Sequence, residues 1–189
     1  SWYSTEFVRA ADDRGAVIGP FGTNMANGEV TEWLRSQDFR ASVPTGGIIT
    51  GLSAKIRLRR TAGGVQLTAV CLRGEDGTYL LPSLRRMTRT LSSSYGVITF
   101  GGPTDQWGVS ITRALLALPE FCVALQCKAT AANSNVEVDY VQIQVHYNTD
   151  QTIQPAAPGA PGSGAVLAAA VKGSVSIGCL LYTSPSPRD

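Results

Sequence analysis

Apolar and polar residues alternate along four stretches of the chain, and this period of two is typical of half-buried β-strands. In residues 52–59 every second residue is apolar, and those between are Ser, Lys or Arg. The alternation recurs in residues 65–71, 121–127 and 141–147. It predicts sheets with one face on a core and one face in water. The residues that we expect in this core are Leu52, Ile56, Leu58, Leu67, Phe121, Val123, Leu125, Val141, Ile143 and Val145.

Shorter segments extend the β pattern. Further strands are expected at residues 14–18, 32–39, 78–81, 96–100 and 107–112. The one helical signal is a single or double turn at residues 113–118, closed by Pro119. Eight or nine short strands at this spacing predict an all-β fold, either a sandwich or a barrel, and we expect an antiparallel, jelly-roll-like β-sandwich.

Turn-forming residues separate these strands. Gly63-Gly64 predicts a hairpin joining residues 52–59 to residues 65–71. Further turns are expected at residues 44–47, 74–77 and 133–135, which are rich in Gly, Pro, Asn or Asp.

Composition divides the chain into four parts. Residues 1–150 are expected to form the sandwich domain. Residues 151–164 are rich in Pro, Gly and Ala, which is typical of a linker. Residues 165–178 would then begin a following element that is cut off.

The last eleven residues, 179–189, resemble a translated sequencing-library adapter. We therefore expect them to be foreign to the domain and the natural part to belong to a larger chain. The chain does not begin with Met, so a signal peptide cannot be judged from it.

The charge balance excludes strongly basic or acidic function classes. The chain has 16 Lys and Arg against 14 Asp and Glu, a net charge of +2. The basic residues of segments 55–60 and 85–89 are interpreted as wet faces of strands, since no phosphate-binding glycine loop accompanies them. No apolar run reaches the roughly 20 residues of a membrane helix. We expect neither nucleic acid nor a membrane span.

Catalytic groups are sparse. His146 is the only histidine and alternates with Gln142 and Gln144, which predicts a solvated surface position. Paired carboxylates for glycoside hydrolysis cannot be placed together from sequence alone. We expect no enzyme activity, and no catalytic, cofactor-binding or metal-binding residues. Calcium on Asp12-Asp13 or Glu75-Asp76 is an alternative, although both pairs are typical of turns.

Several residues have structural interpretations. Cys71, Cys122 and Cys127 lie in apolar runs and are expected to be free buried thiols, with a Cys71–Cys127 disulfide as the alternative. Trp107 is expected in the core or at its rim, with its indole N–H on a carbonyl. Asp139 is expected to accept backbone N–H groups at a turn or bulge.

The chain resembles a jelly-roll-type β-sandwich domain of tailed-bacteriophage virion proteins and bacterial surface proteins. The resemblance lies in residues 33–39, 42–52, 101–108 and 138–147, and is strongest at the Asp-x-Trp-Gly and Val-Asp-Tyr motifs. The Arg-rich residues 84–90 depart from it, which leaves the strand order open. The resemblance implies a virion or extracellular location and a place in a multimeric assembly.

Two functions remain after these exclusions. The first is a non-catalytic structural, assembly or display module of a phage virion protein, whose partners are other virion or surface subunits. The alternative is a carbohydrate- or cell-surface-binding module of a phage or exported bacterial protein. There, Trp2, Trp33 and Tyr79 are the candidates for stacking on a glycan.

Overall fold

The computed structural model describes residues 2–3, 12–13, 15–18, 24–37, 39, 41–74 and 81–149, and the backbone of residues 171–178 and 180–181. These residues are almost entirely β. The strands are β1 (Trp2–Tyr3), β2 (Ala16–Ile18), β3 (Leu34–Gln37), β4 (Gly47–Ala62), β5 (Val65–Arg73), β6 (Arg85–Thr90), β7 (Gly96–Gly101), β8 (Cys122–Ala129), β9 (Asn135–Thr149), β10 (Val171–Gly178) and β11 (Leu180–Leu181). The helices are a 3-10 turn at Leu81–Ser83 and α1 at Arg113–Ala117.

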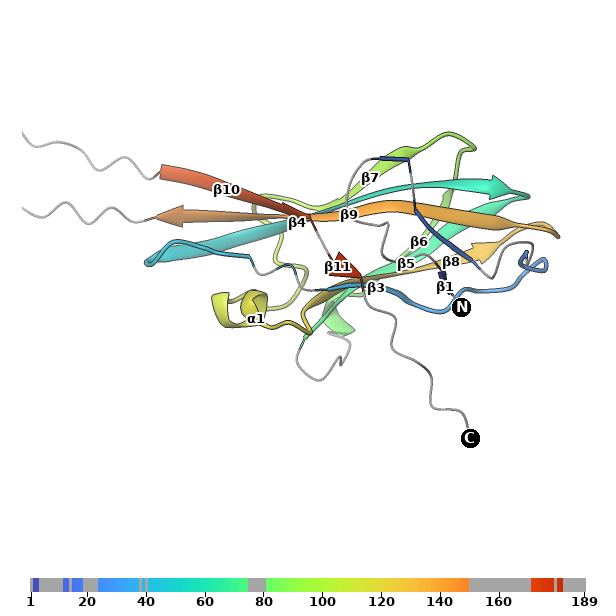
Figure 1. Cartoon of the computed structure of the whole chain (residues 1–189). Coiled ribbons are helices and arrows are strands. Elements are labelled where there is room, and N and C mark those ends of the chain that lie inside the picture. Colours follow the sequence, from blue (N-terminus) through green and yellow to red (C-terminus); the bar gives the residue numbers. More distant parts are fainter. Residues whose placement is uncertain are drawn as a thin grey trace, which may run out of the picture.

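The strands form two antiparallel sheets packed as a sandwich (Figure 1). One sheet has the order β1-β2-β9-β4-β7, with β10 added on β9, and the other has the order β11-β3-β8-β5-β6. Within them, β2 pairs β9, β3 pairs β8, β4 pairs β7 and β5 pairs β6. This nesting, with four of these strands in each sheet, is the arrangement of a jelly roll. The expected all-β antiparallel sandwich is confirmed.

The predicted hairpin at Gly63-Gly64 is wrong. These glycines join β4 to β5, but β4 belongs to one sheet and β5 to the other, so the two strands do not pair. In a jelly roll the chain crosses between layers at such turns, and a Gly-Gly pair serves a crossing as well as a hairpin. The turn at residues 44–47 is confirmed by the Gly47 N–H, which donates to the Pro44 oxygen across 3.0 Å.

The core fills the space between the two sheets. All ten residues predicted for it are at most 2% exposed, so that prediction is confirmed. Outside the alternating strands, loop and helix residues also enter the core, and among these Met25, Phe39, Trp107 and Leu116 are the largest. These four could not be identified by a period of two.

The secondary structure departs from expectation at two places. Residues 107–112 form a loop, because Trp107 has a positive φ of 57° and Gly108 one of 71°, which turn the chain out of an extended path. The Arg-rich stretch that weakened the resemblance contains an edge strand, β6. The expected helix at residues 113–118 is confirmed as α1, capped by the Thr112 hydroxyl on the Leu115 N–H. Residues 78–80 lie outside the described part.

The two strands nearest the C-terminus join the sandwich edges. β10 pairs antiparallel with β9 over its eight residues, and β11 pairs with β3 at Gln37 and Ser36. Figure 1 shows β10 beside the end of β9 and the start of β4. The division of the chain into domain, linker and following element stays a prediction. Across the described residues, no helix is long and apolar enough to cross a membrane.

Candidate functional surface

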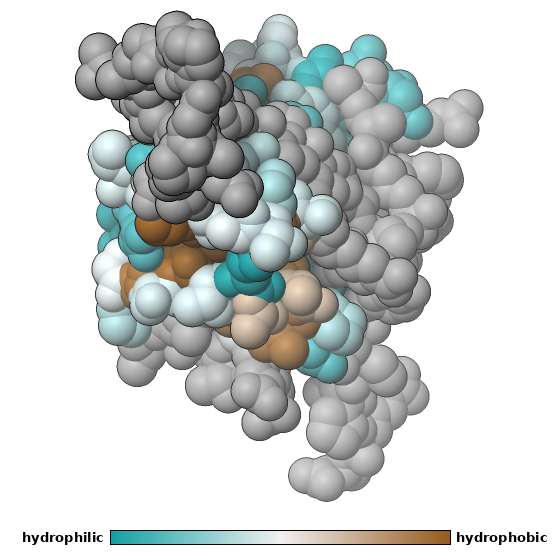
Figure 2. Space-filling view, turned by 90° about the vertical axis from the view of Figure 1, so that its left-hand side faces the viewer, coloured by the Kyte–Doolittle hydropathy of each residue, from teal (hydrophilic) through white to brown (hydrophobic). Residues whose placement is uncertain are grey.

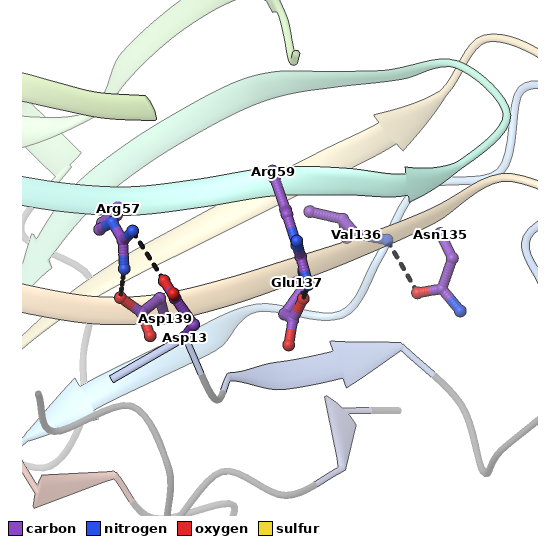
Figure 3. Close-up of polar contacts among 7 residues, drawn as sticks. All are labelled: Asp13, Arg57, Arg59, Asn135, Val136, Glu137 and Asp139. Carbon is purple, nitrogen blue, oxygen red and sulfur yellow. Dashed lines mark hydrogen bonds and ion pairs between the residues drawn. The ribbon is translucent and has the colours of Figure 1, made fainter. Parts of the chain in front are cut away.

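An ion-pair cluster joins β4 to β9 and to the turn before β2 (Figure 3). Arg57 of β4 donates to Asp139 of β9 and to Asp13, the latter with 2.8 Å between Nη2 and Oδ1. Two residues along each strand, Arg59 contacts Glu137 with 2.7 Å between Nη2 and Oε2. The outward row of β4 therefore uses its guanidinium groups to hold neighbouring segments together.

Tyr95 packs against both arginines of this cluster. The Arg57 and Arg59 guanidinium carbons lie 4.2 and 4.3 Å from its ring centroid. Two cations over one ring favour a fixed ring position. Burial, together with the nearby Glu137 carboxylate, raises the pKa of the Tyr95 phenol well above its ordinary value. Tyr95 therefore stays neutral and serves as a support for the arginines.

Asp139 is the most buried member of the cluster, with an exposed fraction of 0%. It is the extra residue of a β-bulge, because Arg57 lies opposite Tyr140 while Leu58 lies opposite Val138. The bulge confirms part of the prediction, but Asp139 bonds the Arg57 side chain rather than backbone N–H groups. Burial raises the pKa of the Asp139 carboxyl, and Arg57 opposes this rise.

A second polar junction lies at the Asp-x-Trp-Gly motif. Arg85 donates to both carboxylate oxygens of Asp105 across 2.7 Å and stacks over the Trp107 ring at 4.4 Å. The Trp107 Nε1–H donates to the Leu52 oxygen across 2.8 Å, as expected for a core tryptophan. Burial raises the pKa of Asp105, but the hydrogen bonds from Arg85 and from the Trp107 N–H outweigh it and leave that pKa below its usual value. The motif thus joins β6 to β4.

His146 is not the simple solvated residue that its alternation predicts. Its Nε2 lies 2.9 Å from the Ser53 hydroxyl, and the ring is half-buried. Burial, and then the charge of Lys55, lower the pKa of the imidazole. Ser53 is itself only 5% exposed, so its hydroxyl is not presented to a substrate. The pair is a contact between β4 and β9.

The predicted glycan-stacking residues are not brought together. Trp2 is 6% exposed and donates from Nε1 to the Glu32 oxygen across 2.9 Å, which leaves no ring face open to a ligand. Trp33 is half-buried and packs on a small apolar cluster of Cys71, Cys122 and Ala124. Tyr79 lies outside the described residues, as does the Glu75-Asp76 pair.

The three cysteines of the sandwich are free, as expected. The alternative Cys71–Cys127 disulfide is wrong, because Cys127 lies in the main core whereas Cys71 lies in the separate cluster with Cys122. Burial raises the pKa of Cys71 to about 11 and that of Cys122 and of Cys127 to about 12. Such thiols are poor nucleophiles at neutral pH.

No group of three or more His, Cys, Asp or Glu residues is placed to hold a metal ion in the part of the chain that the structure describes. Of the residues considered for calcium, Asp13 is instead bound to Arg57.

One end of the sandwich carries an apolar patch, which we call the Ile48 patch. It consists of Val43, Ile48, Ala114, Leu115, Ala117 and Leu118. Ile48, near the start of β4, is 58% exposed. Arg113, at the start of α1, donates to the Val43 and Pro44 oxygens, which places α1 beside the loop that leads into β4. Figure 2 shows this end, with brown apolar surface among pale and teal residues. Sequence alternation could not find the patch, since it combines a loop, a strand end and a helix.

Comparison with known proteins adds no relative. No family model, curated protein or solved structure matches the chain.

Proposed function

We propose that this domain is a non-catalytic assembly or display module of a phage virion protein. Its partners would be neighbouring subunits of the particle, and its location the virion. The observation that carries the proposal is the Ile48 patch, where an isoleucine is 58% exposed at the same end of the sandwich as the partly buried Val43 and Leu115. Large apolar side chains exposed together on one part of a surface are typical of protein contact sites.

The use of the polar residues supports the same function. Arg57, Arg59 and Arg85 are each engaged with carboxylates inside the domain. Ser53 and His146 bond to each other. These contacts stabilise the sandwich, which favours a rigid scaffold over a site for chemistry. Jelly rolls occur in viral capsid proteins and also in lectins, so the fold gives an analogy for both candidate functions and decides neither.

The glycan-binding alternative has less support. It needs aromatic ring faces beside one another at the surface, whereas the Trp2 ring is buried and Trp33 packs on the Cys71 cluster. Trp33, which is half-buried, is the remaining aromatic candidate of the described residues.

Self-association of the full chain tests the proposal. In sedimentation equilibrium at increasing concentration, Ile48→Lys should weaken association, because a charge in an apolar contact is costly. Val97→Lys is the matched control, since Val97 is 52% exposed on the edge strand β7, outside the patch. A chain that stays monomeric but binds glycans on an array, with binding lost in Trp33→Ala, would overturn the proposal in favour of its alternative.

A further inference from the structure

The strand β9 has two edges, and one of them is shared. Along one edge β9 pairs with β4 over almost its whole length. Along the other, β2 covers Glu137 and Val138, and β10 covers Gln142 to Thr149. Without β10, that second half of the edge would present unpaired N–H and C=O groups, which are a template for another strand. The edge from Gln142 to Thr149 is here called the acceptor edge.

The sequence of β10 matches this edge in register. Val175 lies opposite Val145 and Ile177 lies opposite Ile143. Between them, Ser176 lies opposite Gln144. In residues 174–177 apolar residues thus lie opposite apolar ones and polar residues opposite polar ones, and a shift of one residue would exchange the two classes there. Closer to the start of β10, Val171 lies opposite Thr149. The acceptor edge therefore selects this segment in one register.

The connection between the two strands is unusually long. Antiparallel neighbours are commonly joined by about 2–5 residues. Here Thr149 lies opposite Val171, and residues 150–170 join them. A flexible chain of about 20 residues would have a root-mean-square end-to-end distance of roughly 25 Å. Thr149 and Val171 lie opposite each other, so joining them within one chain does not require a connection of this length.

We propose that the acceptor edge is a strand-exchange site whose occupant in the assembled state is β10 of a second copy of this chain. This inference rests on the proposed assembly function and names its contact. In an isolated chain the linker holds β10 at an effective concentration of about the millimolar range, so its own β10 fills the edge. Where copies stand side by side on a particle, a neighbour's β10 reaches a comparable concentration and forms the same backbone bonds.

Disulfide trapping between two full-length chains tests this exchange. Both chains carry Cys179→Ser; one also carries Gln144→Cys and the other, with an added tag for a distinct mobility, carries Ser176→Cys. The register places these two positions opposite each other. After joint unfolding and refolding at high concentration with a glutathione redox couple, we expect a mixed covalent dimer on a non-reducing gel. Its yield should fall when the mixture is diluted before refolding.

A matched control replaces Ser176→Cys by Lys172→Cys in the second chain. Lys172 lies opposite Asn148, four residues from Gln144, or about 13 Å along the strand. That pair should give no mixed dimer above background. If Gln144→Cys and Ser176→Cys give no more mixed dimer than the control pair, strand exchange between chains is overturned. This holds even if a single chain that carries both Gln144→Cys and Ser176→Cys forms the disulfide within itself. If that internally closed chain still self-associates and loses association with Ile48→Lys, the assembly function stands without the exchange.

Discussion

The indole Nε1–H of Trp107 donates to the backbone oxygen of Leu52 across 2.8 Å, and this bond joins the loop after β7 to the centre of β4. The same oxygen also accepts the Gly102 N–H at 3.2 Å. The Trp107 ring is 1% exposed and lies under the Arg85 guanidinium. A single side chain thus anchors a loop, a strand and an edge strand.

Trp107→Phe should lower the free energy of unfolding by about 1–2 kcal/mol, from one lost hydrogen bond and a partly filled cavity. Urea denaturation measures the change. Trp33→Phe, the same substitution in a half-buried tryptophan outside this corner, should cost less. Equal losses for both variants would contradict a special role of the bond to Leu52.

Gly101→Ala should destabilise the domain by more than about 2 kcal/mol, since it combines steric overlap with left-handed strain. Gly101 has a φ of 76°, and an added Cβ would lie 2.0 Å from the Leu52 oxygen. Gly96→Ala on the same strand is the control, because nothing lies within 4 Å of its Cβ position. Thermal unfolding of the two variants should differ clearly; similar midpoints would contradict the close approach at Gly101.

The thiols of Cys71, Cys122 and Cys127 should not react with an aromatic disulfide reagent at pH 8 in the folded protein. All three are at most 1% exposed, and burial raises their pKa values to between about 11 and about 12. Reaction should follow only after denaturant is added. In a Cys179→Ser background, an added Ser93→Cys thiol, at an exposed position, should react at once. Rapid labelling of the folded Cys179→Ser protein that lacks Ser93→Cys would contradict the burial of the three native thiols.

The burial of His146 should make stability depend on pH. Because the folded-state pKa of His146 is lowered, the neutral ring is favoured in the fold. Its contribution is present above the unfolded pKa of about 6.5 and is lost as pH falls through the folded pKa. Denaturation midpoints measured from pH 8 to pH 5 should fall, and His146→Gln should flatten that fall. An equally steep fall in the variant would assign the dependence to other groups.

Two truncations should distinguish the contributions of β10 and β11 to the stability of the domain. Removing residues 179–189 deletes β11, whose pairing is limited to two positions, Leu180 and Leu181. We expect the melting temperature to stay within the few degrees that correspond to about 1 kcal/mol. Removing residues 171–189 also deletes β10 and leaves the acceptor edge bare, so it should lower the melting temperature further. A large loss from the shorter truncation would show that residues 179–189 contribute to the fold.

The sandwich could be predicted from the sequence because alternation reports on burial directly: Leu52, Ile56, Ile143 and Val145 lie in the core where the period of two placed them. The layer to which each strand belongs could not. A Gly-Gly turn permits both a hairpin and a crossing between sheets, and only long-range pairing, such as that of β4 with β9, decides between them.

The candidate surface was less accessible to sequence reasoning than the fold. The Ile48 patch joins a loop, a strand end and α1, and no local pattern reports such a combination. The role of Asp139 was half predicted: a carboxylate within an apolar run indicates a bulge, but its partner Arg57 lies 82 positions away in the chain. The burial of Trp2 depends on distant segments in the same way.

The nested pairing of the strands also constrains how the chain folds. The innermost pair, β5 with β6, closes a short loop, whereas the outermost pair places Ala16 opposite Val138. Each outer pair closes a smaller additional loop once the pair inside it has formed. We therefore expect folding to proceed outward from β5 and β6, at the millisecond-to-second rates of β-proteins with high contact order. The strand β2 would be among the last to join, so a chain paused late in folding would still present an open β9.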